Sequence, residues 1–340
     1  MIQAKETRII LKPRKKIDFE NSGVLNPSTI QKDGITHLFY RAVKEGNYST
    51  LGYCQLKNNH ILYRSSKPIM IPEFPYEAQG IEDPRITYLE GLYYLFYTAF
   101  DGKNALVAYA TSPDLINFTK KGLITPQISY DLAEDIFKES GVNPKYTFFE
   151  QVFKVNRGID VHLWEKDVVL FPQKFNGQYA LIHRILPGIQ ISFFNNFQEL
   201  NNEYWLHYLQ KLNDHIILEP KFDFENAYIG GGCPPILTDR GWLLIYHSTQ
   251  ETNSGQIYHA ATALLDRNNP KKVISRLPYP LFSPTQKWEK EGIVDNIVFP
   301  TGTTIEGDNL NIYYGAADYY IGLKVFSLSE LLVELSKYGP

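Results

Sequence analysis

Short apolar runs alternate with turn residues along the whole chain, and one arrangement of them occurs five times. Each copy reads as a short strand, a tight turn containing Gly, Asp or Asn, and a second strand rich in Tyr, Phe, Leu and Ile. This alternation predicts a β-hairpin in each copy. The copies are NPSTIQKDGITHLFYRAV from Asn26, DPRITYLEGLYYLFYTAF from Asp83, FPQKFNGQYALIHRI from Phe171, CPPILTDRGWLLIYHST from Cys233 and FPTGTTIEGDNLNIYYGAAD from Phe299.

The spacing within the copies and the segments after them indicate how the hairpins assemble. In four copies the proline precedes the turn glycine by seven residues, and from Pro172 to Gly177 the spacing is five. A third apolar stretch follows each copy: STLGYCQL, ALVAYATS, GIQISFF, QIYHAATALLD and YIGLKVFSL. Repeated units of three or four strands predict an all-β fold, a five-bladed β-propeller that forms one domain over residues 1–340. A pair of β-sandwiches is the alternative, but no linker separates two halves.

Two stretches fall outside this repeat. Residues 126–166 form an insertion in which SYDLAEDIFKES predicts a short helix, with Asp131 as candidate N-cap and Leu132 and Ile136 on one face. We expect this insertion to cover one rim, as a lid or as a contact in a homo-oligomer. Residues 327–338 predict a C-terminal helix, because Ser327 and Glu330 form a capping box ahead of a leucine stripe.

Composition excludes several classes of function. The hydrophobic share of 44%, the charged share of 21% and short apolar runs are typical of a soluble protein without membrane spans. The net charge of −3 without a long basic run argues against nucleic-acid binding. Cys54 and Cys233 form no CxxC pair or Cys/His cluster, so we expect two core thiols and no metal site. The first residues, MIQAKETRIILKPRKK, contain no secretory signal, which favours a cytoplasmic protein.

Aromatic residues make up 14% of the chain, and they both favour strands and stack on sugar rings. In a propeller the inner strands converge on a channel, so a site there combines residues that lie far apart in the sequence. The polar residues beside the prolines and at the ends of the second strands are therefore candidates, although each one alone fits a rim salt bridge or a capped turn. They include Asn26, Arg41, Glu82, Asp83, Arg85, Lys166, Arg184, His247 and Asp318.

Asp83 is the most constrained candidate. The proline after it predicts an extended backbone, which would fix the direction of the carboxylate. Glu82 would raise the pKa of Asp83 and Arg85 would lower it, so the sequence leaves the direction of the shift open. An acid that protonates a leaving group must carry its proton at working pH, and burial in an aromatic channel favours that form. The glycines of IGGGCPP precede a strand, which argues against a dinucleotide motif and predicts close backbone approach at the channel mouth.

Several ordered segments, spread over nearly the whole chain, resemble glycoside hydrolase family 130. They are LFYRA, GIEDPRIT, VVLFPQKFNGQYALIHR, IGGGCPPILTDRGWLLIYH, ALLD at 263–266, and VFPTG with YYGAAD. That family comprises β-mannoside phosphorylases and related β-mannosidases on a five-bladed propeller. The resemblance implies that Asp83 is the general acid and relays its proton through a hydroxyl of the bound mannose. It also implies a substrate-binding group, to which we assign Asn26, Arg41, Glu82, Arg85 and Asp318.

The nucleophile side of the reaction separates two hypotheses. An inverting displacement uses either phosphate, which requires cations, or water activated by a second carboxylate. Arg184 matches a basic position of the phosphorylases, and we assign Lys166 and His247 to phosphate binding as well. Leu237 stands in PPILT where many phosphorylases have the lysine of PPIKT, a loss that we expect to weaken phosphate binding by about one to two decades. If the nucleophile is water, Glu225 and Glu251 are the candidate bases.

The leading hypothesis is an inverting enzyme that cleaves β-mannosides with phosphate and releases α-mannose 1-phosphate. It requires inorganic phosphate as co-substrate and no metal or other cofactor. The second hypothesis is an inverting β-mannosidase that uses water. A non-catalytic sugar-binding propeller is a third. A five-bladed glycosidase acting on arabinan or fructan is a fourth, although the carboxylate triad usual in such enzymes is not evident here.

Overall fold

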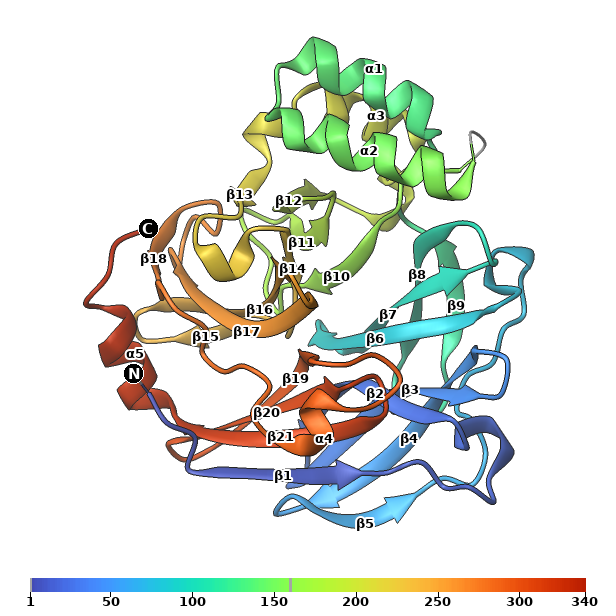
Figure 1. Ribbon diagram of the computed structural model, residues 1–340, viewed down its shortest axis with the longest axis vertical. Coiled ribbons are helices and arrows are strands. Elements are labelled where there is room, and N and C mark those ends of the chain that lie inside the picture. Colours follow the sequence, from blue (N-terminus) through green and yellow to red (C-terminus); the bar gives the residue numbers. More distant parts are fainter. Residues whose placement is uncertain (1, 159–160) are drawn as a thin grey trace.

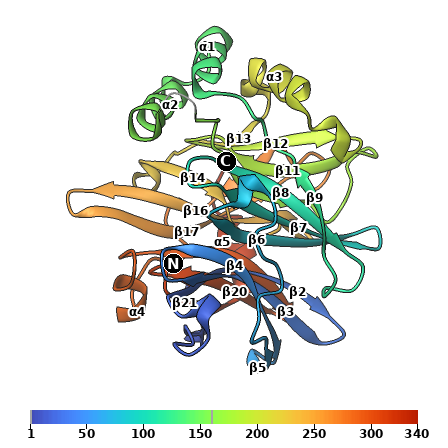
Figure 2. The same cartoon turned by 90° about the vertical axis from the view of Figure 1, so that its right-hand side faces the viewer.

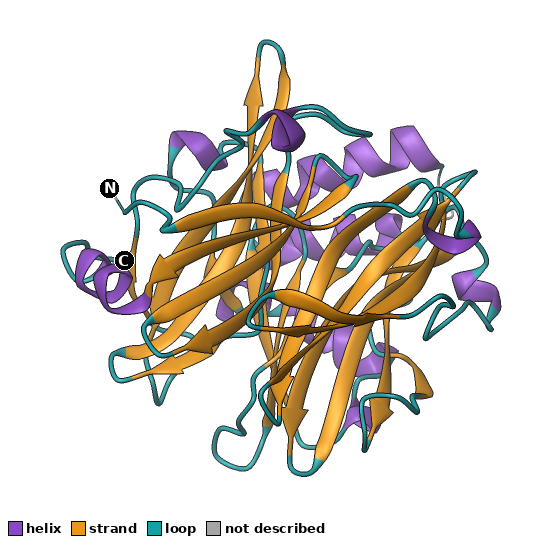
Figure 3. Ribbon diagram, turned by 90° about the horizontal axis from the view of Figure 1, so that it is seen from below, coloured by secondary structure: helices purple, strands orange, loops and turns teal. Residues whose placement is uncertain are grey.

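The computed structural model describes residues 2–158 and 161–340, and within them the fold is mostly β with few helices (Figure 3). The predicted all-β class is confirmed at this level. Cys54 and Cys233 are buried free thiols, as expected. No helix within the described ranges is long and apolar enough to span a bilayer.

Strand pairing within the described ranges gives five groups in chain order (Figure 1). The first group holds β2 (Gly23–Lys32), β3 (Ile35–Lys44), β4 (Tyr48–Lys57) and β5 (His60–Arg64). The second holds β6 (Gly80–Leu89), β7 (Leu92–Phe100), β8 (Ala105–Ser112) and β9 (Thr119–Leu123). These two groups belong to one sheet, joined through the parallel pair of Ser49 with Gly80.

The other three groups are separate sheets. The third holds β10 (Lys166–Leu170), β11 (Tyr179–Arg184), β12 (Ile189–Phe194) and β13 (Ile216–Leu218). The fourth holds β14 (Tyr228–Gly231), β15 (Ile236–Thr238), β16 (Gly241–Thr252), β17 (Gly255–Leu265) and β18 (Val273–Arg276). The fifth holds β19 (Val298–Glu306), β20 (Asn309–Ala316) and β21 (Tyr320–Ser327), with β1 (Glu6–Leu11) paired to β21.

All five predicted hairpins and the third strand after each are present. The role of β1, which brings the start of the chain against the last group, had no counterpart in the sequence analysis. In Figure 1 the groups follow one another around a common centre, with both termini on the same side. Neighbouring groups touch through their inner strands: β6 packs against β2 and β10, and β19 packs against β2 and β16.

Register shifts interrupt the first strands of several groups. They lie between Leu25 and Ser28 in β2, between Glu82 and Arg85 in β6, and between Lys166 and Val169 in β10. The residues inside these shifts include Asn26, Asp83 and Asp167, whose φ angles of 48°, 50° and 60° are left-handed. A β-bulge bends its strand and turns a side chain in a new direction, so equivalent irregularities give three groups one polar side chain each at the centre.

A buried glutamate precedes the first strand of each group, and none of the five is exposed. In four groups it accepts a hydrogen bond from a tyrosine hydroxyl on a middle strand and contacts an arginine or lysine. These sets are Glu20–Tyr40–Arg64, Glu77–Tyr97–Lys120, Glu225–Tyr246–Arg276 and Glu289–Tyr314–Lys324. In the third group, Glu165 contacts His183 at 3.0 Å, and the other ring nitrogen of His183 lies 2.7 Å from the hydroxyl of Tyr208. We call each set a glutamate clamp.

Three helices gather at one end of the molecule, above the third group (Figures 1 and 2). The insertion forms α1 (Tyr130–Ser140) and α2 (Pro144–Arg157), and α3 (Asn202–Gln210) packs beside α1. The helix predicted over SYDLAEDIFKES is confirmed, but Ser129 is its N-cap rather than Asp131, because the Ser129 hydroxyl accepts the N–H of Leu132 at 3.3 Å. Leu132 and Ile136 lie one turn apart in this helix, but only Ile136 is buried and Leu132 is exposed. The sequence analysis did not predict α2 or α3.

The C-terminal helix is α5 (Leu328–Leu335), and a short α4 (Lys287–Lys290) precedes β19. The predicted cap of α5 is confirmed, because the Ser327 hydroxyl accepts the N–H of Glu330. Leu331, Leu332 and Leu335 are buried, so this helix is anchored on the fifth group by the expected apolar face.

Candidate active site

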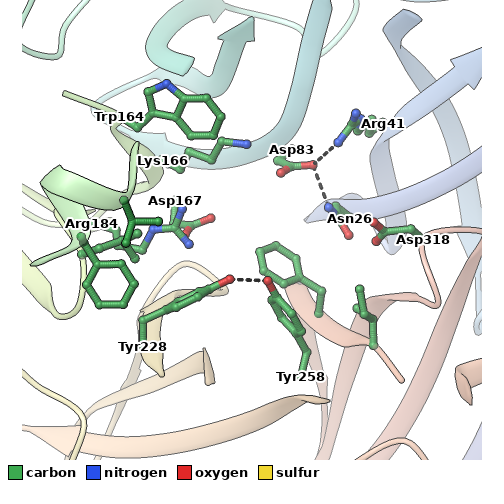
Figure 4. Close-up of a pocket in the computed structure, with 15 residues that line it drawn as sticks. Asn26, Arg41, Asp83, Trp164, Lys166, Asp167, Arg184, Tyr228, Tyr258 and Asp318 are labelled. Carbon is green, nitrogen blue, oxygen red and sulfur yellow. Dashed lines mark hydrogen bonds and ion pairs between the residues drawn. The ribbon is translucent and has the colours of Figure 1, made fainter. Parts of the chain in front are cut away.

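A cavity of about 340 Å³ lies where the five groups meet, and each group contributes to its wall (Figure 4). Asn26 and Arg41 come from the first group, Asp83 from the second, and Lys166, Asp167 and Arg184 from the third. Tyr228 and Tyr258 come from the fourth, and Phe299 and Asp318 from the fifth. Phe149 and Val152 of α2 complete one side, so the insertion reaches the cavity.

Asp83 points into this cavity from the bulge in β6. Its φ of 50° contradicts the extended backbone that the following proline predicted. The reason is the register shift between Glu82 and Arg85, which places Asp83 outside the regular ladder, where an aspartate tolerates the left-handed region better than most residues do. Asn26 donates a hydrogen bond to Asp83 Oδ1 at 2.7 Å, and an Arg41 nitrogen lies 3.9 Å from the same oxygen (Figure 4).

The two aspartates on this side differ in their affinity for a proton. Burial raises the pKa of Asp83, but nearby cations, foremost Arg41, outweigh it, so that the pKa lies below its ordinary value. Burial raises the pKa of Asp318 to about 6, and the charge of Asp83 adds to the shift while Arg41 opposes it. Of the two carboxyl groups, Asp318 therefore holds a proton more readily than Asp83.

Arg41 is held in place by several partners. Its Nε donates to the Ser49 hydroxyl at 2.8 Å, and a terminal nitrogen lies 2.7 Å from Glu82. Lys166 approaches the other oxygen of Glu82 at 3.6 Å, and its side chain points towards Asp83 (Figure 4). Glu82 is thus a buried anchor between two cations. The backbone of Lys166 pairs with that of Arg184, but its ammonium is directed to the Asp83 side of the cavity.

Arg85 lies beneath the cavity and does not line it. It is 1% exposed, and its Nε donates to the carbonyl of Gly232 at 2.7 Å. Another nitrogen lies 3.5 Å from Asp167. Contrary to the prediction from the sequence, Arg85 is therefore not placed to contact a substrate in this cavity. It links the second, third and fourth groups below the cavity instead.

The opposite wall carries Arg184 and a carboxylate that the sequence analysis missed. Arg184 lies 2.9 Å from Asp167, and its guanidinium stacks at 5.6 Å from the ring centre of Tyr228. The buried Nε of Arg184 has no hydrogen-bond partner among the described residues. This wall therefore presents a cation with an unused donor, held by one anionic neighbour.

His247 supports this wall from behind. It is fully buried, does not line the cavity, and lies 3.4 Å from an Arg184 nitrogen. Burial, helped by the charge of Arg184, lowers the pKa of His247 to about 3, although Asp167 opposes the shift. His247 is therefore neutral and accepts from Arg184, and, contrary to the prediction from the sequence, it is not placed to contact phosphate directly.

The glycines of IGGGCPP allow the third and fourth groups to approach closely, as predicted. A Cβ on Gly230 would lie 2.3 Å from His247, 2.6 Å from Asp167 and 2.8 Å from Arg184. Any larger residue at position 230 would displace the side chains that hold Arg184. Gly315 has the same role opposite, because a Cβ there would lie 2.1 Å from the Asn26 side chain.

Three sequence-based assignments lie away from this cavity. Glu225 belongs to a glutamate clamp, where Tyr246 and Arg276 occupy its carboxylate. Glu251 is exposed and accepts a hydrogen bond from Gln256. Leu237 lies on β15 and is 40% exposed outside the cavity. Neither glutamate is placed to activate water there, and the absence of lysine at 237 removes no contact from this site.

Asp167, Tyr228, Tyr258 and Trp164 are the site residues that sequence reasoning missed. Asp167 follows Lys166 without a motif of its own and reaches the cavity through the bulge. The hydroxyls of Tyr228 and Tyr258 hydrogen-bond to each other below the centre (Figure 4). The only sequence feature that pointed to these tyrosines was the high aromatic content of the chain. That content does not distinguish aromatic residues of the core from those of a binding site.

A second cavity of about 560 Å³ adjoins the first. The two share Arg41, Trp164, Lys166 and Asp318, whereas Arg184 and Asp167 border only the first. The hairpin of residues 43–47, Phe100, Ile293 and Val294 complete the second cavity. It therefore opens on the Asp83 side of the site.

The arrangement places an acidic pair and a cationic wall around one space large enough for a sugar unit and a small anion. Among the described residues no group of three or more His, Cys, Asp or Glu is arranged to hold a metal ion. Carboxylates, hydroxyl-bearing rings and an arginine are the groups that recognise hydroxyls and phosphate oxygens.

Comparisons with known proteins identify the family of this chain. The family model of glycoside hydrolase family 130, described as beta-1,4-mannooligosaccharide phosphorylase, matches residues 2–337. A 1,2-beta-oligomannan phosphorylase from Thermoanaerobacter sp. (strain X514) is 33% identical over 334 residues, covering 95% of this chain and 96% of that protein. A beta-1,2-mannobiose phosphorylase of the same organism is 33% identical over 339 residues, with the same coverage.

Solved structures show the same fold. A beta-1,2-mannobiose phosphorylase from Listeria innocua, in complex with beta-1,2-mannobiose, has a TM-score of 0.71 and 23% identity, covering 93% of this chain and 92% of that one. The chain described here belongs to glycoside hydrolase family 130.

Proposed function

We propose that the protein is an inverting β-mannoside phosphorylase. One observation carries this proposal: Asp83 and Arg184 face one cavity from opposite walls, as displacement by an anion requires. The similarity to named mannoside phosphorylases over almost the whole chain supports the substrate class. The two sites predicted for a water-activating base lie outside the cavity, and Asp167 inside it is paired with Arg184 and Arg85, which disfavours hydrolysis.

In the proposed reaction, a phosphate oxygen attacks the anomeric carbon from the Arg184 side while the glycosidic C–O bond breaks. The proton from the Asp83 side goes to the leaving oxygen, so the free sugar leaves neutral. Phosphate arrives with its charge and needs no base, which suits a wall where Arg184 offers a cation and the histidine behind it is neutral. The product is mannose 1-phosphate with inverted, α configuration.

Asn26, Arg41 and Asp318 are proposed to hold the mannosyl unit, with Glu82 fixing Arg41. The leaving sugar is proposed to extend into the second cavity, because that cavity adjoins the Asp83 side and not the Arg184 side. Its size and the partly exposed Trp164 at the junction favour oligosaccharides longer than two units.

For the fold we propose a five-bladed β-propeller in which each strand group is a blade. Two features support it. The first cavity and a third, lined by Thr29, Ile86, Pro172, Pro235 and Thr303 among others, both draw residues from all five groups, as the two ends of a central channel would. The contacts of the inner strands run from β2 through β6, β10, β14, β16 and β19 back to β2.

The proposal is tested with β-1,2- and β-1,4-linked mannobiose and mannotriose, each incubated with and without inorganic phosphate. We expect α-mannose 1-phosphate in the phosphate arm only, and faster turnover of the triose than of the biose. Equal release of free mannose in both arms would make the protein a mannosidase. No release in either arm would support a propeller that binds sugar without cleaving it.

A further inference from the structure

Two residues of the first cavity, Arg41 and Arg184, directly follow a residue of a glutamate clamp. We infer that the clamp Glu165–His183–Tyr208 is the positioning device for Arg184, and hence for the phosphate of the proposed function on which this inference rests. The corresponding clamp Glu20–Tyr40–Arg64 positions Arg41 for the sugar.

The chain itself links each clamp to its cavity residue. His183 directly precedes Arg184 on β11, and Tyr40 directly precedes Arg41 on β3. Successive side chains of a strand point to opposite faces. The clamp therefore fixes the strand on one face, directly beside the position where the arginine projects from the other face. Lys166 pairs with Arg184 across the ladder, so the neighbouring Glu165 and His183 meet on the far side of the same two strands.

The clamps derive from one repeated sequence feature. Each glutamate follows an aromatic residue: Phe19–Glu20, Tyr76–Glu77, Trp164–Glu165, Phe224–Glu225 and Trp288–Glu289. The glutamate of the pair precedes the proline of its group by seven residues in the first three copies. In the last two copies the spacing is nine and eleven residues. All five clamps therefore share a structural role, and what distinguishes them is the residue that follows the tyrosine or histidine.

The following residue is Arg41 in the first group, Thr98 in the second, Arg184 in the third, His247 in the fourth and Gly315 in the fifth. Arg41 and Arg184 line the cavity, whereas Thr98 lines neither the first nor the second cavity. The second clamp therefore serves as a control, because it also consists of a buried glutamate, tyrosine and cation, but the residue that follows its tyrosine lines neither cavity.

The third clamp differs in composition in a way that fits its task. His183 replaces the tyrosine, and Tyr208 of α3 takes the place of the arginine or lysine. The Tyr208 hydroxyl also donates to the carbonyl of Ile191 at 3.0 Å, so the clamp ties β11 to β10, β12 and a helix. Burial raises the pKa of Glu165, and His183 opposes that shift. A long side chain such as Arg184 transmits a small shift of its backbone to the guanidinium, which weakens directional bonds to an anion.

Three matched substitutions test the inference, since each removes one hydroxyl from a buried clamp: Tyr208→Phe, Tyr40→Phe and Tyr97→Phe. The readouts are KM for inorganic phosphate, KM for the mannoside and the midpoint of thermal unfolding. We expect Tyr208→Phe to raise KM for phosphate about three- to tenfold with KM for the mannoside within twofold. Tyr40→Phe should show the reverse pattern. Tyr97→Phe should lower the midpoint and leave both constants within twofold.

A purely structural role is the outcome that overturns the inference: Tyr208→Phe would leave KM for phosphate unchanged, or Tyr97→Phe would raise it equally. If Tyr208→Phe does not fold, Glu165→Gln is the second variant, because the amide keeps the shape and an acceptor for His183, and the same rise in KM for phosphate is expected. A wild-type protein that turns over mannosides equally without phosphate refutes the proposed function instead. In that case the first clamp is tested by comparing KM for the mannoside in Tyr40→Phe and in Tyr97→Phe. A rise in Tyr40→Phe alone would support its positioning role, and equal values would contradict it.

Discussion

The two walls of the cavity differ in the number of charged side chains and in how these are arranged. On one wall Asp83 and Asp318 share the space with Arg41 and Lys166, and the pKa values of the two acids are shifted in opposite directions. On the other wall Arg184 is paired with Asp167 and backed by a neutral His247. The first wall is built to hold and give up a proton, and the second to keep a positive charge. Six of these residues line the cavity and come from three different sheets, so the difference between the walls is a property of the assembled site.

Of the changes that test the difference between the two walls, removal of the acid Asp83 has the largest expected effect. Asp83→Asn keeps the hydrogen bond from Asn26 but carries no transferable proton, so kcat should fall by about 10²- to 10⁴-fold. Initial rates with mannobiose and saturating phosphate measure the loss. A mannoside with a leaving group that needs no protonation should recover most of the rate, and turnover near that of the wild type with mannobiose would contradict the assignment.

Removing the cation of the opposite wall is the next largest change. Arg184→Ala should raise KM for phosphate by about 10- to 100-fold, because a hydrogen bond to a charged group is lost and Asp167, left with Arg85 as its only cationic partner among the described residues, repels the anion. KM for the mannoside should change little. The two walls would not be distinct if both constants rose together.

The pH dependence sharpens the account of the acidic wall. Because the pKa of Asp318 is raised to about 6, the pair with Asp83 holds a proton below that pH and loses it above. We expect kcat/KM for the mannoside to fall by about tenfold per pH unit above the inflection near pH 6. In Asp318→Asn that inflection should move to lower pH, since Asp83, with its lowered pKa, is left as the acid. An unchanged profile in the variant would show that the proton does not depend on Asp318.

The smallest expected effect is at position 237. Leu237→Lys introduces the lysine that the family resemblance implies at this position, but the side chain is exposed outside the cavity. KM for phosphate should therefore stay within twofold of the wild type. A tenfold decrease in KM for phosphate would mean that the lysine reaches the phosphate. The wall around Arg184 would then include position 237, contrary to the description above.

The sequence predicted those features that depend on local chemistry. The spacing of proline and turn glycine located all five hairpins, because a tight turn demands particular residues. Ser327 and Glu330 located the start of α5, and the glycine run predicted the close approach at Gly230. The site residues Asp83, Arg41, Asn26 and Asp318 meet in one cavity as the motifs implied.

Features that depend on tertiary contacts could not be predicted in this way. Asp167 is brought to the cavity by a bulge and a left-handed φ, neither of which has a signature in its neighbours. Glu225 was predicted from the sequence as a candidate base, but it is buried beside Arg276 and belongs to a glutamate clamp. The repeated aromatic–glutamate pair was readable, yet its distance to the proline changes in the last two copies and hides the repeat.

The most direct test of the division between the two walls is a calorimetric titration of inorganic phosphate into wild type, Asp83→Asn and Arg184→Ala. The account predicts that wild type and Asp83→Asn bind phosphate with similar affinity and that Arg184→Ala loses most of the binding. Phosphate binding that survives in Arg184→Ala but disappears in Asp83→Asn would contradict it.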